Sequence, residues 1–102
     1  MREVVWAEAA LDDMDSIVAY IAADSANAAR KVLDRIETTA NRLGRMATGR
    51  SGRVTGCYEK SVVGLPYIIA YALQPLPDGG ERIVILRLIH PARDWPKGKW
   101  PE

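Results

Sequence analysis

Two amphipathic stretches, separated by a break of only a few residues, constrain the fold more than any other feature of this chain. They run from about Glu8 to Ala23 and from about Asn27 to Leu43. In both stretches apolar residues recur every three or four positions, which is the spacing of one buried helix face. Asp24-Ser25 offers a new N-cap between them, and Gly44 offers a C-terminal stop. So short a break predicts two helices that fold back on each other as an antiparallel hairpin.

The first stretch carries an apolar stripe on one side and acids among the other positions. The stripe consists of Ala10, Met14, Ile17, Val18 and Ile21. We expect the neighbouring Asp12, Asp13 and Asp15 mostly to face water, on the polar side of an amphipathic helix.

Strand signals surround this helical region. Residues 2 to 6 read as a short strand, and a glycine-punctuated loop at residues 44 to 53 precedes three further strands. These run from about Val54 to Val63, Tyr67 to Gln74 and Arg82 to His90. Short links between them favour antiparallel pairing. The predicted fold is therefore α+β: a short N-terminal strand, then a helical hairpin packed on a three- to four-stranded antiparallel sheet.

The length of the chain, 102 residues, predicts a single domain over residues 1–102. Residues 91–102 hold three prolines and two tryptophans, and we expect them to form an extended basic tail. No apolar run approaches the roughly 20 residues of a membrane helix. The N-terminus does not resemble an export signal, and a lone Cys57 fits a reducing compartment. We expect a cytoplasmic protein without a membrane partner.

Charge is segregated along the chain although the net charge is only +1. Residues 8 to 37 contain seven acids and three bases, whereas residues 42 to 60 contain five bases and one acid. Residues 82 to 99 again contain five bases and one acid. This segregation predicts a polarised surface suited to an anionic partner.

Several kinds of chemistry lack the residues that they need. One histidine and one cysteine cannot build a zinc site unaided, and no acid cluster has the spacing of a calcium loop. Neither a phosphate-binding GxxxxGK[ST] nor a dinucleotide-binding GxGxxG is present, and no serine lies on a nucleophile elbow. We expect no metal and no cofactor, and conventional hydrolase activity is disfavoured.

Four strings of residues, in the order of the predicted elements, resemble a known family. They are Trp6-x-x-x-Ala10-x-x-Asp13 with Ile17-x-x-Tyr20-Ile21, then Gly49-Arg50-Ser51-Gly52-Arg53-Val54-x-Gly56, then Pro66-Tyr67-Ile68-Ile69-x-Tyr71, and finally Ile85-Leu86-Arg87-x-Ile89-His90-x-Ala92-Arg93-Asp94-Trp95-Pro96. Together they span nearly the whole chain and resemble the RelE/ParE toxin superfamily, its ParE branch most of all. The resemblance implies the toxin of a type II toxin–antitoxin system and a cognate ParD-like antitoxin, whose unstructured segment folds as it wraps the toxin.

The resemblance leaves the target open, because one fold can host several functions. ParE relatives are associated with poisoning DNA gyrase, whereas RelE relatives cut messenger RNA on the ribosome. A third reading is a non-toxic interaction module that keeps the scaffold.

A metal-free nuclease would need a base, a cation and a proton donor. The candidates are Arg53, Glu59, Lys60, Arg87 and His90. Arg87 and His90 lie three apart on a strand, which points their side chains to opposite faces. RelE relatives carry a tyrosine just beyond the final strand, but here that region offers Trp95, which has no acid–base proton, and Tyr58 lies elsewhere. We therefore expect a gyrase-inhibiting toxin rather than an enzyme.

The candidates for target binding concentrate near the C-terminus. They are Arg87, His90, Arg93, Trp95, Lys97, Lys99 and Trp100. Arg87 would be costly to bury unpaired, so we expect it to pair with a carboxylate, for which Glu59 is one option, or to line a partner groove. His90 is expected on the strand face of Val84, Leu86 and Leu88, and a histidine satisfied at the strand end, fixing the following turn, is favoured over a target-binding role.

Overall fold

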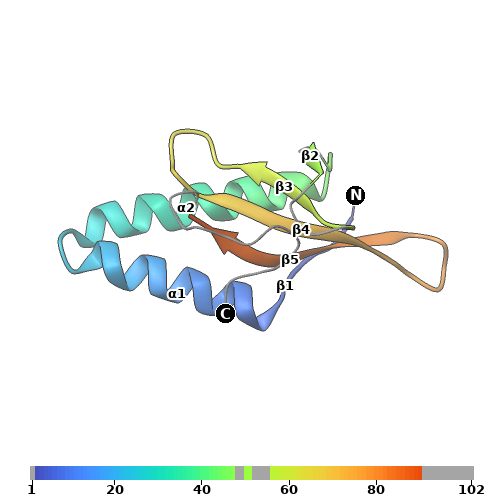
Figure 1. Ribbon diagram of the computed structural model, residues 1–102, viewed down its shortest axis with the longest axis horizontal. Coiled ribbons are helices and arrows are strands. Elements are labelled where there is room, and N and C mark those ends of the chain that lie inside the picture. The colour runs from blue at the N-terminus through green and yellow to red at the C-terminus, as the bar shows by residue number, and fades with distance from the viewer. Residues whose placement is uncertain (1, 48–49, 52–55, 91–102) are drawn as a thin grey trace.

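The computed structural model describes residues 2–47, 50–51 and 56–90 of the chain. Its elements, in order, are β1 (Val4–Trp6), α1 (Glu8–Ala22), α2 (Ala26–Leu43), β2 (Arg50–Ser51), β3 (Tyr58–Ser61), β4 (Ile68–Pro75) and β5 (Glu81–Ile89). The strands form one sheet in the order β1-β5-β4-β3-β2 (Figure 1). The predicted α+β class is confirmed.

The helical hairpin is confirmed, with bounds within about one residue of those predicted. Figure 1 shows α1 and α2 running side by side, joined by a tight connection. At the start of α2 the Ser25 hydroxyl accepts a hydrogen bond from the Ala28 backbone N–H at 3.1 Å. This bond satisfies one of the amide groups that a helix leaves unpaired at its first turn. Neither α1 nor α2, the helices of the described residues, is long and apolar enough to cross a membrane.

The sheet is mixed rather than purely antiparallel. Strands β3, β4 and β5 pair antiparallel as predicted, but β1 joins the edge of β5 in parallel, with Val4 opposite Ile83. Parallel neighbours need a long crossover, and the chain between β1 and β5 includes both helices and three strands. At the other edge the two-residue β2, in a segment expected to be loop, pairs with β3.

The core lies between the hairpin and one face of the sheet. Met14 of α1 and Ile36 of α2 pack in one buried cluster with Ile69, Tyr71 and Ile85 of the sheet. Burying an isoleucine or methionine side chain contributes about 1.5–3 kcal/mol, so this cluster is the main stabilising contact between the layers. Tyr71 lies on this face beside Ile69, as the alternation of the strand predicts.

A β-bulge in β5 reverses which residues of that strand face the helices. Tyr71 pairs with Ile85 and Ala70 pairs with Arg87, so Leu86 is an extra residue without an opposite partner. Ile83 and Ile85 belong to the core before the bulge, and Leu88 belongs to it after the bulge. The expectation that Leu88 shares a face with Val84 is therefore wrong, because an uninterrupted period of two cannot represent the inserted residue.

Candidate functional site

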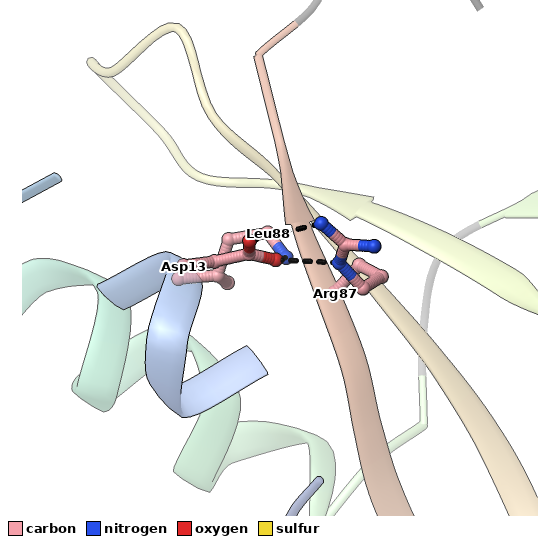
Figure 2. Close-up of polar contacts among 3 residues, drawn as sticks. All are labelled: Asp13, Arg87 and Leu88. Carbon is pink, nitrogen blue, oxygen red and sulfur yellow. Dashed lines mark hydrogen bonds and ion pairs between the residues drawn. The ribbon is translucent and has the colours of Figure 1, made fainter. Parts of the chain in front are cut away.

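The edge of β5 beyond the bulge is bound by an acidic side chain from α1. Strand β1 pairs only with Ile83–Ile85, so the following part of β5 extends past it. There the Asp13 carboxylate accepts hydrogen bonds from the Leu88 backbone N–H at 3.0 Å and from the Arg87 guanidinium at 2.8 and 3.0 Å (Figure 2). The prediction that Asp13 mostly faces water is wrong. The prediction that Arg87 pairs with a carboxylate is confirmed, and that carboxylate is Asp13 rather than the suggested Glu59.

This Asp13–Arg87 ion pair is largely sheltered from water. The Asp13 side chain is only 19% exposed and the Arg87 side chain only 21% exposed, and the guanidinium binds both carboxylate oxygens. Bidentate, charge-assisted bonds of this kind are stronger than neutral ones. The hydrogen bond that Arg87 donates to Asp13 raises the pKa of Arg87 above its ordinary value, although burial opposes the rise. Arg87 is thus a fixed cation with a bound counter-ion, and it cannot donate a proton at neutral pH.

Glu59 and Arg87 lie in one row of strand positions on the sheet face turned away from the helices, and the Arg87 guanidinium reaches Asp13 of α1 at the edge of β5 (Figure 2). Glu59 of β3 is opposite Ala70 of β4, which in turn is opposite Arg87 of β5. Glu59 is only 5% exposed and Ala70 is fully buried. Because adjacent strands lie about 4.8 Å apart, the backbones of Glu59 and Arg87 are about 10 Å apart. These two of the predicted site residues therefore share a face.

Lys60 and His90 lie elsewhere. Lys60 pairs with Ile69, a residue of the helix-covered face, and lines a groove against α2. The half-buried His90 contacts Tyr67 edge-on, with 5.6 Å between ring centroids. The described members of the predicted nuclease set thus occupy three separate places rather than one constellation. Arg53 lies outside the described residues.

The C-terminal candidates for target binding also lie outside the described residues. They are Arg93, Trp95, Lys97, Lys99 and Trp100. Their role, like the extended form of the tail, stays a prediction. Among the described residues no group of three or more His, Cys, Asp or Glu side chains could hold a metal ion.

A basic groove between α2 and β3 was missed by the sequence analysis. It encloses about 880 Å³ and is lined by Lys31, Asp34, Arg35, Thr38, Thr39, Arg42, Leu43, Arg45, Met46, Lys60, Ser61 and Val63. Counting charge by stretches of sequence placed Lys31 and Arg35 in an acidic segment. Their spacing of four on a helix was the available signal, because it puts them on one face, the face that Arg42 continues.

Tyr71 makes the stability of the fold sensitive to alkali. Its buried ring stacks on Tyr58 at 5.5 Å, and burial, followed by the neighbouring Tyr58, raises the pKa of Tyr71. A tyrosine whose folded pKa is raised contributes stability fully present below its ordinary pKa near 10 and lost as pH rises through the folded value. We expect the free energy of unfolding to fall across this window.

Urea unfolding measured from about pH 8 to pH 11 tests this expectation. Tyr71→Phe should flatten the alkaline decline, whereas Tyr20→Phe, at a tyrosine that is 80% exposed, should leave it unchanged. An equal effect of the two substitutions would contradict the assignment to Tyr71.

A helical hairpin covering one face of a small mixed sheet defines the class of this protein as an α+β domain. The structure superposes on a chain of the chromosomal ParDE toxin–antitoxin system of P. aeruginosa with a TM-score of 0.76. That match has 23% identity and covers 88% of this chain and 96% of the other, and at this identity it shows the fold.

Two sequence comparisons go further than the fold. Residues 4–95 match the family model described as the ParE toxin of the type II toxin–antitoxin system parDE. Y4kP of Sinorhizobium fredii (strain NGR234), named as a candidate toxin, is 33% identical over 97 residues, which are 94% of this chain and 95% of that protein. The chain therefore belongs to the ParE family of toxins of type II toxin–antitoxin systems, as the resemblance predicted.

Proposed function

We propose that this ParE-family toxin arrests growth by inhibiting DNA gyrase and that a cognate ParD-like antitoxin neutralises it. The observation that supports this proposal most is the Asp13–Arg87 ion pair. It occupies Arg87, one of the cations that a nuclease on this sheet could use to bind a phosphate, and Arg87 in this pair cannot donate a proton at neutral pH. The dispersal of Glu59, Lys60 and His90 over three places argues in the same direction.

The alternative is a RelE-like nuclease that cuts messenger RNA on the ribosome. Such a reaction needs a base, a positive charge and a proton donor gathered around one phosphate. Among the described residues, Tyr58 is a partly exposed phenol on β3 that could donate a proton, and its ring is stacked on Tyr71. It therefore offers a way to test the nuclease alternative directly.

The antitoxin part of the proposal rests on the family. The family description pairs this toxin with a second component, and the P. aeruginosa neighbour is a ParDE system. An antitoxin segment that is unstructured alone and folds on binding can wrap a large surface of a small toxin. Growth after induction, with and without the neighbouring reading frame, tests this part. Growth arrest that the neighbour relieves is expected, and harmless expression of the chain alone would favour the non-toxic module.

Purified protein separates the two targets. Added to gyrase and plasmid DNA, the chain should inhibit supercoiling or trap cleaved DNA, while ribosome-bound message stays intact. The matched variant Tyr58→Phe keeps the ring and removes only the hydroxyl, so it should still inhibit gyrase. Cleaved message ending in a 2′,3′-cyclic phosphate, together with loss of growth arrest in Tyr58→Phe, would establish the nuclease and overturn the proposal.

A further inference from the structure

A straight row of cations runs along the exposed side of α2. Arg35 follows Lys31 by four positions and Arg42 follows it by eleven. All three side chains are exposed, and all three line the groove towards β3. With a rise of about 1.5 Å per residue, the row is about 16 Å long. Helix geometry therefore holds these three charges in line without any further contact.

The remaining walls of the groove add more positive charge. Lys60 of β3 and Arg45, which follows α2, raise the number of cations lining it to five, against the single carboxylate of Asp34. The Arg35 guanidinium also donates a hydrogen bond to the Val63 carbonyl at 3.0 Å, which links α2 to the segment after β3. A positively charged groove with a fixed wall attracts anions more strongly than scattered surface charges do.

Helix α1 carries the opposite charge. It contains Glu8, Asp12, Asp13 and Asp15 and no basic residue. The two halves of the hairpin therefore differ in sign although the chain as a whole is close to neutral. A molecule polarised in this way is oriented by the field of a large anion before contact, with its basic groove foremost.

We propose that the α2–β3 groove binds the phosphate backbone of double-stranded DNA. The two strands of a duplex together place one negative charge about every 1.7 Å along the axis, so a row of cations about 16 Å long lies against a dense array of phosphates. Lysine and arginine bind phosphate oxygens without reading sequence, and the Thr38 hydroxyl at the groove can add a donor. The inference deepens the proposed function, because gyrase acts on DNA, but the binding itself requires no gyrase.

An acidic peptide is the competing occupant, and the groove suits it less well. Peptide recognition relies on apolar anchors inserted into pockets. Leu43, the large apolar side chain beneath the groove, is 1% exposed, and the exposed apolar side chains that line it are Met46 and Val63. A straight row of cations on a rigid helix matches the regular charge of a duplex better than that of a short chain.

The test uses the full chain made by cell-free synthesis and a labelled random-sequence duplex of about 20 base pairs. Fluorescence anisotropy should give an affinity that falls with salt, with a logarithmic slope of about −3 to −4 if about four phosphates are contacted. Lys31→Glu and Arg42→Glu should each weaken binding about tenfold at about 50 mM salt and make the slope shallower by about one or more.

Arg30→Glu is the matched control, because Arg30 is an exposed residue of the same helix that does not line the groove. It makes the same change in net charge as Arg42→Glu and should weaken binding less than about twofold. Melting curves of all three variants should coincide with that of the parent, since surface substitutions change stability by about 0.5 kcal/mol or less.

Two results would overturn the inference. One is equal loss of DNA binding in Arg30→Glu and Arg42→Glu, which would show that DNA binding depends on the net charge of the protein rather than on the groove. The other is loss of binding to an oligoglutamate probe in the groove variants while DNA binding persists, which would assign the groove to an acidic peptide. If DNA binding depends on the groove but the protein does not inhibit gyrase, this inference is supported and the proposal that gyrase is the target is contradicted.

Discussion

Replacing Asp13 by alanine is expected to destabilise the fold by about 3 kcal/mol, which lowers the Tm of a domain of this size by about 12–24 °C. The substitution leaves the Arg87 guanidinium in a site where it retains 21% of its exposure, without the Asp13 oxygens that hold it. It also removes the acceptor for the Leu88 backbone N–H at the edge of β5. The loss of the Asp13 carboxylate from a sheltered guanidinium and an unsatisfied amide both cost free energy, and the remaining exposure keeps the loss below that of a fully buried pair.

Two further substitutions at this helix make the experiment specific. Asp12→Ala removes the adjacent acid, which is exposed, and should change stability by about 0.5 kcal/mol or less. Asp13→Asn loses the charge but keeps an oxygen for the Leu88 N–H, so its melting temperature should fall between those of Asp13→Ala and the parent. Thermal melts with urea titrations provide the measurement. Equal effects of Asp12→Ala and Asp13→Ala would show that the ion pair contributes nothing to stability.

Gly44→Ala is expected to cost about 2 kcal/mol, through a steric contact rather than through backbone conformation. Gly44 ends α2 with an ordinary helical φ of −63°, so alanine suits its backbone. A Cβ there would lie 2.6 Å from the Arg2 carbonyl oxygen. That backbone cannot move away easily, because the Arg2 N–H donates to the Gly44 carbonyl at 2.7 Å and β1 follows directly.

The sign of the change at Gly44 distinguishes the two explanations. In a helix free of neighbours, alanine stabilises by about 1 kcal/mol relative to glycine. Gly79→Ala provides the contrast, because Gly79 has a φ of +88° and open space around its Cα. Its cost of about 1–2 kcal/mol would come from the left-handed conformation alone. A Gly44→Ala variant as stable as the parent in urea titrations would refute the close approach of β1.

The strength of the local pattern explains why the elements were predictable. Apolar spacing of three and four marked both helices, the Ser25 cap separated them, and alternation with turn residues marked β4 and β5. A short connection between helices leaves little choice but a hairpin. These features are determined by residues that are close in the sequence, so they can be predicted from short stretches of it.

The site depended on contacts between residues far apart in the chain. Asp13 lies three positions after Ala10 and four before Ile17, on the side of α1 that faces the sheet. Its spacing therefore indicated a position facing the sheet, whereas its charge suggested exposure to water. The preference of Asp13 for water is reversed only by its partner across the fold, because the positive charge of Arg87 offsets the cost of removing the Asp13 carboxylate from water. The bulge at Leu86, the parallel edge strand and the α2–β3 groove arise in the same way.

By itself, the sequence determined the two helices and the strands other than β2, their order, the helical hairpin and membership of the ParE family, because each follows from residue spacing or from short strings of residues. The tertiary structure decided the direction of β1, the face on which each residue of β5 lies, the pairing of Asp13 with Arg87 and the gathering of cations beside α2. Those depend on which surfaces meet once the hairpin closes over the sheet. An ion pair between residues 13 and 87, or a groove between a helix and a strand, has no counterpart in any single stretch of sequence.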